Sequence, residues 1–282
     1  MVMPLRLPLR RAWAVPPQRG FTLLELVLVI VILGIVATMV AVFMRSPINA
    51  YFDVGRRAAL TDIADTVIRR ISRDVQGALP NSVRTPNTQC LEFIPTKTGG
   101  RYRAADAGAL NFGSGGASSF NMFGDNAAWP VDQQIKVGDT VAIYNLGIPG
   151  ASAYSQDNTA AVTSVGAASG APPETSIGIT TGTLFPLTSP SNRFQVIPGN
   201  ENVVSYVCTG GVLRRTASTL TFAATNSCPA TGPIIATNVS SCDFSYSGSD
   251  LQRNALTRLT LQLTSGGETV SLLREVHVNN TP

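Results

Sequence analysis

Residues 19–44 read R-G-F-T-L-L-E-L-V-L-V-I-V-I-L-G-I-V-A-T-M-V-A-V-F-M, and Glu25 is the only ionisable side chain between Phe21 and Met44. An α-helix rises about 1.5 Å per residue, so this run predicts a helix roughly 36 Å long. That length exceeds the hydrocarbon core of a bilayer, about 30 Å, and predicts a membrane span. An intramembrane carboxylate normally has a partner, so either Glu25 has a function or the anchor tolerates one polar residue near its end.

The composition favours an exported protein over a cytosolic enzyme. The 282-residue chain is 44% hydrophobic and only 13% charged, with 25 Gly and 18 Pro. Soluble domains usually contain about 25% charged residues, so this surface must rely on uncharged polar side chains, as β-rich exported domains do. The length allows one soluble domain with a full core in addition to the anchor.

The positive charge is concentrated in the first 20 residues, which contain four arginines and no acidic residue. Without them, 17 of the 21 basic residues remain against 17 acidic ones, so the rest of the chain is formally neutral. A basic leader favours the cytoplasmic side of a membrane. Nucleic-acid binding needs clustered positive charge, so no nucleic acid is expected as a partner.

The boundary between the basic leader and the apolar run resembles a known family signal. Arg19-Gly20, followed by Phe21-Thr22-Leu23-Leu24-Glu25 and an unbroken apolar run, resembles the prepilin signal of type IV pilins and type II secretion pseudopilins. The resemblance implies that residues 1–20 are a leader, that a prepilin peptidase cleaves between Gly20 and Phe21, and that Phe21 is then N-methylated. It also implies that Glu25 pairs with the N-terminal amine of a neighbouring subunit during assembly.

The same family implies an α+β fold, with a long N-terminal helix and a C-terminal antiparallel β-rich domain in the periplasm. The implied partners are the prepilin peptidase, other major and minor pilin-like subunits, the inner membrane and the pilus assembly platform. Further local stretches resemble minor pilin-like proteins of the mannose-sensitive haemagglutinin (MSHA) pilus, including R-R-I-S-R-D (69–74), A-L-P-N-S-V-R (78–84), C-L-E-F-I-P-T (90–96), G-G-R-Y-R (99–103), Y-N-L-G-I (144–148), R-F-Q-V (193–196), V-S-Y-V-C (204–208) and L-R-R (213–215).

These stretches favour a minor pilin-like subunit that serves assembly or initiation of an MSHA-type pilus. Three alternatives remain open at this stage. They are a type II secretion minor pseudopilin, a tip adhesin, and a DNA-uptake minor pilin.

The apolar helix (21–45) is followed by an amphipathic segment (46–79). Apolar residues recur at helical spacings of three and four, at Leu60, Ala64, Val67, Ile71, Val75 and Ala78. Gly77 and Pro80 predict the end of the helix. Pro47 cannot donate a backbone hydrogen bond, so we expect a kink or break there, with Ser46 as a cap. The cluster Arg69, Arg70 and Arg73 is interleaved with acids and most simply forms a solvated helix face.

Residues 80–282 predict a β-rich domain with long loops rich in Gly, Ser and Asn. Strands are expected at 90–94, 141–146, 193–197, 202–208 and 212–216, and long loops at 104–130 and from 147 to about 174. The clearest hairpin is the last one, where Leu259, Leu261 and Leu263 alternate with polar residues before the turn at 265–267. Leu273 interrupts the returning alternation, which predicts a β-bulge.

Four cysteines lie beyond the anchor: Cys90, Cys208, Cys228 and Cys242. They lack C-x-x-C spacing, and His277 is the only histidine, which argues against a zinc site. In an exported domain two disulfides are expected, with three possible connectivities. We favour Cys90–Cys208 with Cys228–Cys242, and buried free thiols are the alternative.

Enzymatic chemistry is not expected from this sequence. One histidine leaves no His pair for a metal and little prospect of a Ser-His-Asp arrangement. Scattered acids at Asp106, Asp125, Asp132 and Asp139 lack the spacing of a calcium loop and are expected to be solvated. We therefore predict no cofactor and no metal, and we expect His277 to be a solvated strand residue.

Overall fold

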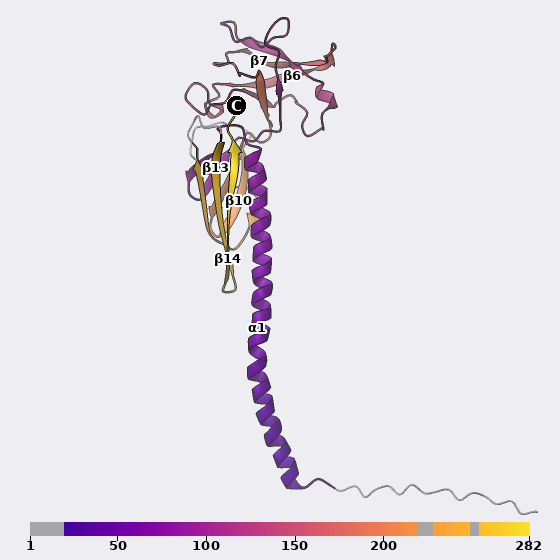
Figure 1. The fold of residues 1–282 in the computed structure, drawn as a ribbon, viewed down its shortest axis with the longest axis vertical. Helices are drawn as coiled ribbons and strands as arrows, with labels where there is room; N and C mark the ends of the chain where they lie inside the picture. Colours follow the sequence, from indigo (N-terminus) through magenta and orange to yellow (C-terminus); the bar gives the residue numbers. More distant parts are fainter. Residues whose placement is uncertain (1–19, 219–227, 249–253) are drawn as a thin grey trace, which may run out of the picture. The chain divides into compact units, whose positions relative to one another are not determined.

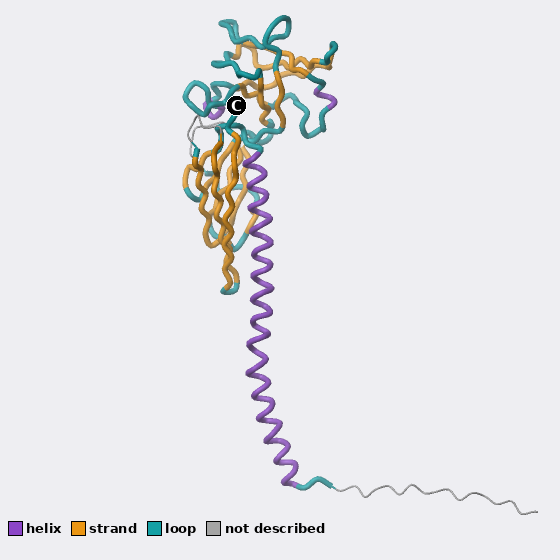
Figure 2. The backbone as a smooth tube through the Cα atoms, viewed as in Figure 1, coloured by secondary structure: helices purple, strands orange, loops and turns teal. Residues whose placement is uncertain are grey.

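A computed structural model describes residues 20–218, 228–248 and 254–282, so most of the predicted leader lies outside the described residues. A single long helix, α1 (Leu23–Gln76), is followed by antiparallel β-sheets, which confirms the predicted α+β class (Figure 1; Figure 2). The chain separates into two compact units, Met1–Val54 and Gly55–Pro282, and each is described by itself.

The first unit consists mainly of the apolar part of α1, which continues through Pro47. Of the two outcomes predicted there, the break with Ser46 as a cap was wrong, whereas the kink stays a prediction. Pro47 has no N–H, so the carbonyl of Phe43 lacks its usual donor, but the other backbone bonds of the helix can form on both sides. One missing hydrogen bond is therefore tolerated without ending the helix. At its far end α1 stops at Gln76, next to Gly77, as predicted.

In the second unit the last turns of α1 bury one stripe against two antiparallel sheets. The six apolar residues predicted from the helical period are all buried and share one core with the sheets, which confirms the prediction. One sheet has the order β1-β2-β9-β10-β11 and the other β12-β13-β14. Their strands are β1 (Arg84–Asn87), β2 (Cys90–Phe93), β9 (Val203–Thr209), β10 (Val212–Ser218), β11 (Ile234–Ala236), β12 (Val239–Ser247), β13 (Asn254–Ser265) and β14 (Glu268–Asn279).

The final hairpin, β13–β14, is paired in continuous register, with Leu273 opposite Thr260. The predicted bulge at Leu273 is therefore absent. Leu273 is 62% exposed on this strand, so an apolar residue occupies the solvent side of a regular ladder. The polar face predicted for His277 is confirmed, because His277 is exposed between the buried residues Val276 and Val278.

A second β-layer is inserted between β2 and β9. Its six strands have the order β3-β8-β5-β6-β7-β4, and an isolated bridge between Tyr102 and Met122 brings the two ends of this sheet together. The interior is filled by its own apolar core, including Phe120, Phe194 and Val196. The strands are β3 (Thr98–Arg101), β4 (Ala117–Phe123), β5 (Thr140–Ile143), β6 (Thr159–Ser169), β7 (Glu174–Thr183) and β8 (Arg193–Ile197), with short 3₁₀ helices η1 (Asn126–Ala128) and η2 (Ala153–Ser155).

This sheet contradicts the predicted loops at 104–130 and 147–174. Strand β4 lies in the first and the whole of β6 in the second. Strand β4 begins Ala-Ser-Ser, and β6 contains four Ala, two Ser and one Gly, so neither has a strong strand signal of its own. Pairing with β7 on either side supplies the hydrogen bonds that stabilise them.

Asparagine side chains connect the inserted sheet to the segment that follows α1 and to the residue that follows β14. Asn81 donates from Nδ2 to the carbonyl of Asn145 (2.9 Å), and its backbone N–H donates to Oδ1 of Asn280 (3.1 Å). Asn145 in turn donates to the carbonyl of Pro80 (2.6 Å) and accepts from the N–H of Ala153 (2.8 Å). Asn81 has φ +58°, a backbone conformation that asparagine tolerates better than most residues.

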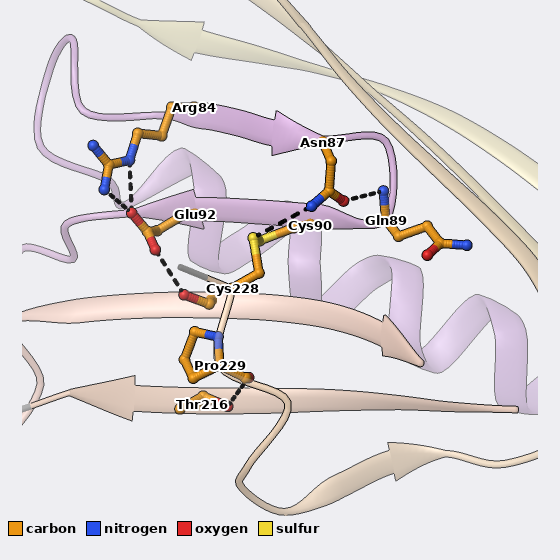
Figure 3. Close-up of a disulfide and its surroundings, with 9 residues drawn as sticks. Arg84, Asn87, Gln89, Cys90, Glu92, Thr216, Cys228 and Pro229 are labelled. Carbon is orange, nitrogen blue, oxygen red and sulfur yellow. Dashed lines mark hydrogen bonds and ion pairs between the residues drawn. A yellow bond between two sulfur atoms is a disulfide. The ribbon is translucent and has the colours of Figure 1, made fainter. Parts of the chain in front are cut away.

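All four cysteines are paired, as Cys90–Cys228 and Cys208–Cys242. The formation of two disulfides was expected, but the favoured connectivity was wrong. The reason is topological, because β2 lies between β1 and β9 and its residue Cys90 is opposite Val207 rather than Cys208. Figure 3 shows Cys90 meeting Cys228 beside Asn87, while Cys208 of β9 reaches Cys242 of β12 and links the two sheets that contact α1.

Candidate functional site

The residues that begin the helix form an N-terminal cap. Gly20, Phe21 and Thr22 precede α1, and the backbone N–H of Glu25 donates to Oγ1 of Thr22 (3.2 Å). A Thr side chain at this position satisfies one of the first N–H groups, which have no intrahelical partner. The sequence pointed to Gly20, Phe21 and Glu25 but missed Thr22. Its signal was the T-x-x-E spacing of a capping box.

Phe21 and Glu25 therefore lie within about one turn of the same helix end, and both are exposed. The large apolar side chains of this part of the chain, from Phe21 to Met44, are each 46–82% exposed. A helix that is apolar on every side needs a membrane or other helices around it. Among the described residues, α1 is long and apolar enough to cross a membrane, judged by length and composition.

The other end of α1 is tied to β9 and β10 by a charged network within the second unit. Asp74 Oδ2 accepts hydrogen bonds from the Tyr206 hydroxyl (2.6 Å) and from Arg215 Nε (3.1 Å). Arg215 also donates to both carboxylate oxygens of Glu201, at 2.9 and 3.0 Å. These hydrogen bonds lower the pKa of Glu201, while burial and the Asp74 carboxylate raise the pKa of the Tyr206 phenol. Sequence spacing gave no signal for this network.

The lowered pKa of Glu201 predicts an acid-dependent stability. Its ionised form contributes stability above its unfolded pKa of about 4.3, and this contribution is lost as the pH falls through the lower folded pKa. We expect Glu201→Gln to lower the urea midpoint at pH 7 and to match the wild type near pH 2. Urea denaturation at both pH values checks this. A midpoint difference that stays constant across pH would contradict it.

The arginine cluster on α1 is solvent-exposed. Arg69 forms an ion pair with Asp65 at 2.6 Å, one turn earlier on the helix, which fits the predicted solvated face. Arg73 lines a groove of about 330 Å³ together with Arg274 and His277 of β14. Exposed i,i+4 pairs of this kind contribute only about 0.3–0.5 kcal/mol, so Arg69 is not a strong determinant of the fold.

The four acids considered for calcium lie in different environments. Asp106 and Asp132 are solvent-exposed, as predicted, and Asp125 caps η1 by accepting from the N–H of Ala127 (2.8 Å). Asp139 is buried rather than solvated, and it pairs with Lys97 at 2.5 Å. Across the described ranges, no group of three or more His, Cys, Asp or Glu residues is close enough to hold a metal ion. The absence of a cofactor stays a prediction.

Comparison with known proteins gives one match. Residues 16–41 match the family described as "Prokaryotic N-terminal methylation motif". No curated protein and no solved structure matches the chain. The matched residues include Gly20, Phe21, Thr22 and Glu25, so the match falls on the segment whose helix cap is described above.

The motif implies processing by a prepilin peptidase and assembly with other pilins, and the apolar helix that follows it suggests a single-pass membrane anchor. Cleavage at Gly20, methylation of Phe21 and the intersubunit role of Glu25 stay predictions. The chain thus carries the N-terminal methylation motif of prepilin-type, type IV pilin-like proteins at the start of a 54-residue helix, ahead of its antiparallel β-sheets.

Proposed function

We propose that the chain is a minor pilin-like subunit that resembles MshO of the MSHA pilus system and serves assembly or initiation of a type IV pilus. The observation that carries the proposal is the methylation motif at the start of a continuous apolar helix. The helix anchors the precursor in the inner membrane, and the β-rich part lies in the periplasm. The role is structural rather than enzymatic.

The proposal rests physically on the free-energy cost of leaving the apolar part of α1 exposed to water. Its apolar side chains are exposed around the whole circumference, so the segment needs lipid before assembly and neighbouring helices afterwards. Glu25 favours the move from lipid into the filament. A carboxylate in an apolar environment gains from a cationic partner, and cleavage before Phe21 would create an amine in every subunit.

Glu25→Leu should therefore reduce incorporation into the filament at least tenfold while leaving membrane insertion intact. Removing the carboxylate makes the helix more apolar, so insertion is favoured, but the partner for the neighbouring amine is lost. Quantitative immunoblotting of sheared filaments and of membrane fractions measures the two quantities separately.

Thr38→Val is the matched control. Thr38 is a polar residue in the same helix, but its hydroxyl donates to the carbonyl of Ile35 (2.8 Å) within the helix. Its loss should leave incorporation unchanged. Normal filament incorporation of Glu25→Leu, or an equal defect in Thr38→Val, would refute the role proposed for Glu25.

The assignment to an MSHA pilus rests on the local resemblances, and a GspJ-like minor pseudopilin of type II secretion is the alternative. The two differ in what a deletion removes. We expect deletion of this chain to abolish surface pili and to leave the export of folded hydrolases intact. Loss of export with normal piliation would favour the pseudopilin.

A further inference from the structure

A shallow pocket of about 360 Å³ lies at the outer face of strands β3 and β8, away from the methylation motif in the sequence. Its lining includes Thr96, Thr98, Arg101, Arg193 and Gln195. A volume of this size lies in the range of small-molecule sites. None of these residues belongs to the assembly role proposed above.

Two arginines face each other across the strands. The antiparallel register places Arg101 opposite Arg193, and both side chains are exposed. Phe194 and Val196 of β8 are buried in the sheet's core, so Arg193 and Gln195 alternate with them toward the outside. Like charges directly opposite one another destabilise a sheet. Within the described ranges, no ion pair offsets the charge of either guanidinium.

The next outward-facing pair leaves space beside these arginines. Gly99 is opposite Gln195 and brings no side chain to the surface. A Cβ on Gly99 would come within 2.8 Å of the carbonyl oxygen of Phe194, so a larger residue cannot be added without a shift of the strands. The floor of the pocket is therefore bare backbone.

Gln195 supplies a hydrogen-bond acceptor without a partner among the described residues. Its Oε1 is buried and has no hydrogen-bond partner among the described residues. Buried acceptors are normally satisfied, so an acceptor of this kind calls for a donor such as a hydroxyl. Oε1 is covered in the structure, so the terminal amide has to rotate about its last torsion before Oε1 can accept a hydrogen bond from a ligand in the pocket. Thr98 adds a hydroxyl group to the same lining, whereas the Thr96 hydroxyl already donates to the carbonyl of Gly77 (2.8 Å) and can only accept from a ligand.

We propose that this face binds an acidic sugar. The carboxylate lies between Arg101 and Arg193, where planar guanidinium groups can donate paired hydrogen bonds to its two oxygens. A sugar hydroxyl donates to Gln195 Oε1, and the ring lies over Gly99. The bound anion relieves the repulsion between the two arginines, so binding also stabilises the sheet.

Saturation-transfer NMR titrations of the full chain in detergent, at low ionic strength, test the proposal. The probes are D-glucuronate, D-glucose, acetate and glucose 6-phosphate. We expect glucuronate to bind more tightly than the other three, because it alone combines a carboxylate with ring hydroxyls. Arg101→Ala and Arg193→Ala should each weaken glucuronate binding at least about tenfold, the usual effect of losing a charge-assisted hydrogen bond.

Two further variants keep the test decisive. Arg193→Glu places opposite charges across the strands, which favours the fold. We expect it to raise the melting temperature and to abolish glucuronate binding. Arg274→Ala removes an exposed arginine from β14 and should leave binding unchanged.

Three results would overturn the proposal. They are equal glucuronate affinity in the wild type and Arg193→Ala, an equal loss in Arg274→Ala, and acetate or glucose 6-phosphate binding as tightly as glucuronate. Since glucuronate binding does not require filament assembly, the outcome is independent of the Glu25 experiment.

Discussion

Arg84→Met should lower the free energy of unfolding by about 3 kcal/mol, because it leaves the carboxylate of Glu92 buried without its cation. Arg84 Nε donates to Glu92 Oε1 at 2.6 Å (Figure 3), and Ser205 Oγ donates to the other carboxylate oxygen at 3.1 Å. The Glu92 side chain is only 4% exposed, so water cannot replace the lost contact.

The guanidinium of Arg84 has a second contact that the substitution removes. It lies 3.7 Å from the ring centroid of Tyr154, a cation–π geometry. The Tyr154 hydroxyl donates to the carbonyl of Ser82 (2.8 Å), which fixes the ring between β1 and the inserted sheet. Methionine keeps much of the apolar contact with the ring, so the measured loss reports mainly on the charge.

Urea denaturation of the full chain in detergent, followed by near-ultraviolet circular dichroism, measures the effect. A loss of this size corresponds to a fall in melting temperature of roughly 6–12 °C for a domain of about 200 residues. Adding Glu92→Gln to Arg84→Met should recover part of the loss, because the unpaired buried charge is then removed.

The matched control is Arg57→Ala, which breaks an ion pair with Glu268 at 2.9 Å. The Glu268 side chain is 21% exposed, against 4% for Glu92, so water reaches the carboxylate that remains. Surface pairs contribute about 0–1 kcal/mol, so the control should change stability little. If Arg84→Met and Arg57→Ala cost the same, Glu92 is not an isolated buried charge and the explanation fails.

The sequence predicted the fold correctly where a periodic apolar pattern packs against a continuous core. The helical stripe from Leu60 to Val75 and the alternation from Leu259 to Leu263 both correspond to buried faces in the structure. Each pattern is local, because the residues that define it lie within one helix or one strand. Such patterns identify the element and its buried face together.

Prediction failed where stability comes from distant partners. Seven of the eleven residues of strand β6 are Ala, Ser or Gly, and its strand geometry depends on pairing with β5 and β7. The break predicted at Pro47 was wrong for a related reason, since propensity counts the lost donor but not the rest of the helix. In the candidate site, too, the contiguous part could be predicted and the part that depends on distant contacts could not. The methylation motif is contiguous, whereas Asp74, Glu201 and Arg215 come from separate elements.

Replacing Cys208 and Cys242 together by alanine should lower the free energy of unfolding by about 3–4 kcal/mol, within the usual range for a native disulfide. The bridge closes a separation of 34 residues and links β9 to β12 beneath α1. In the chain-entropy account, its removal mainly gives freedom back to the unfolded chain, so the native sheets should keep their pairing. Urea denaturation of the double variant measures the loss.

Two controls separate the bridge from its buried sulfur atoms and test the pairing. Reduced wild-type protein keeps both sulfurs, so it should lose nearly as much stability as the double variant if the covalent link is the cause. In the single variant Cys208→Ala, alkylation should label Cys242 alone, because Cys90 remains bonded to Cys228. Under the Cys90–Cys208 pairing the label would appear on Cys90 instead. Peptide mapping by mass spectrometry distinguishes the two, and a label on Cys90 would refute the observed connectivity.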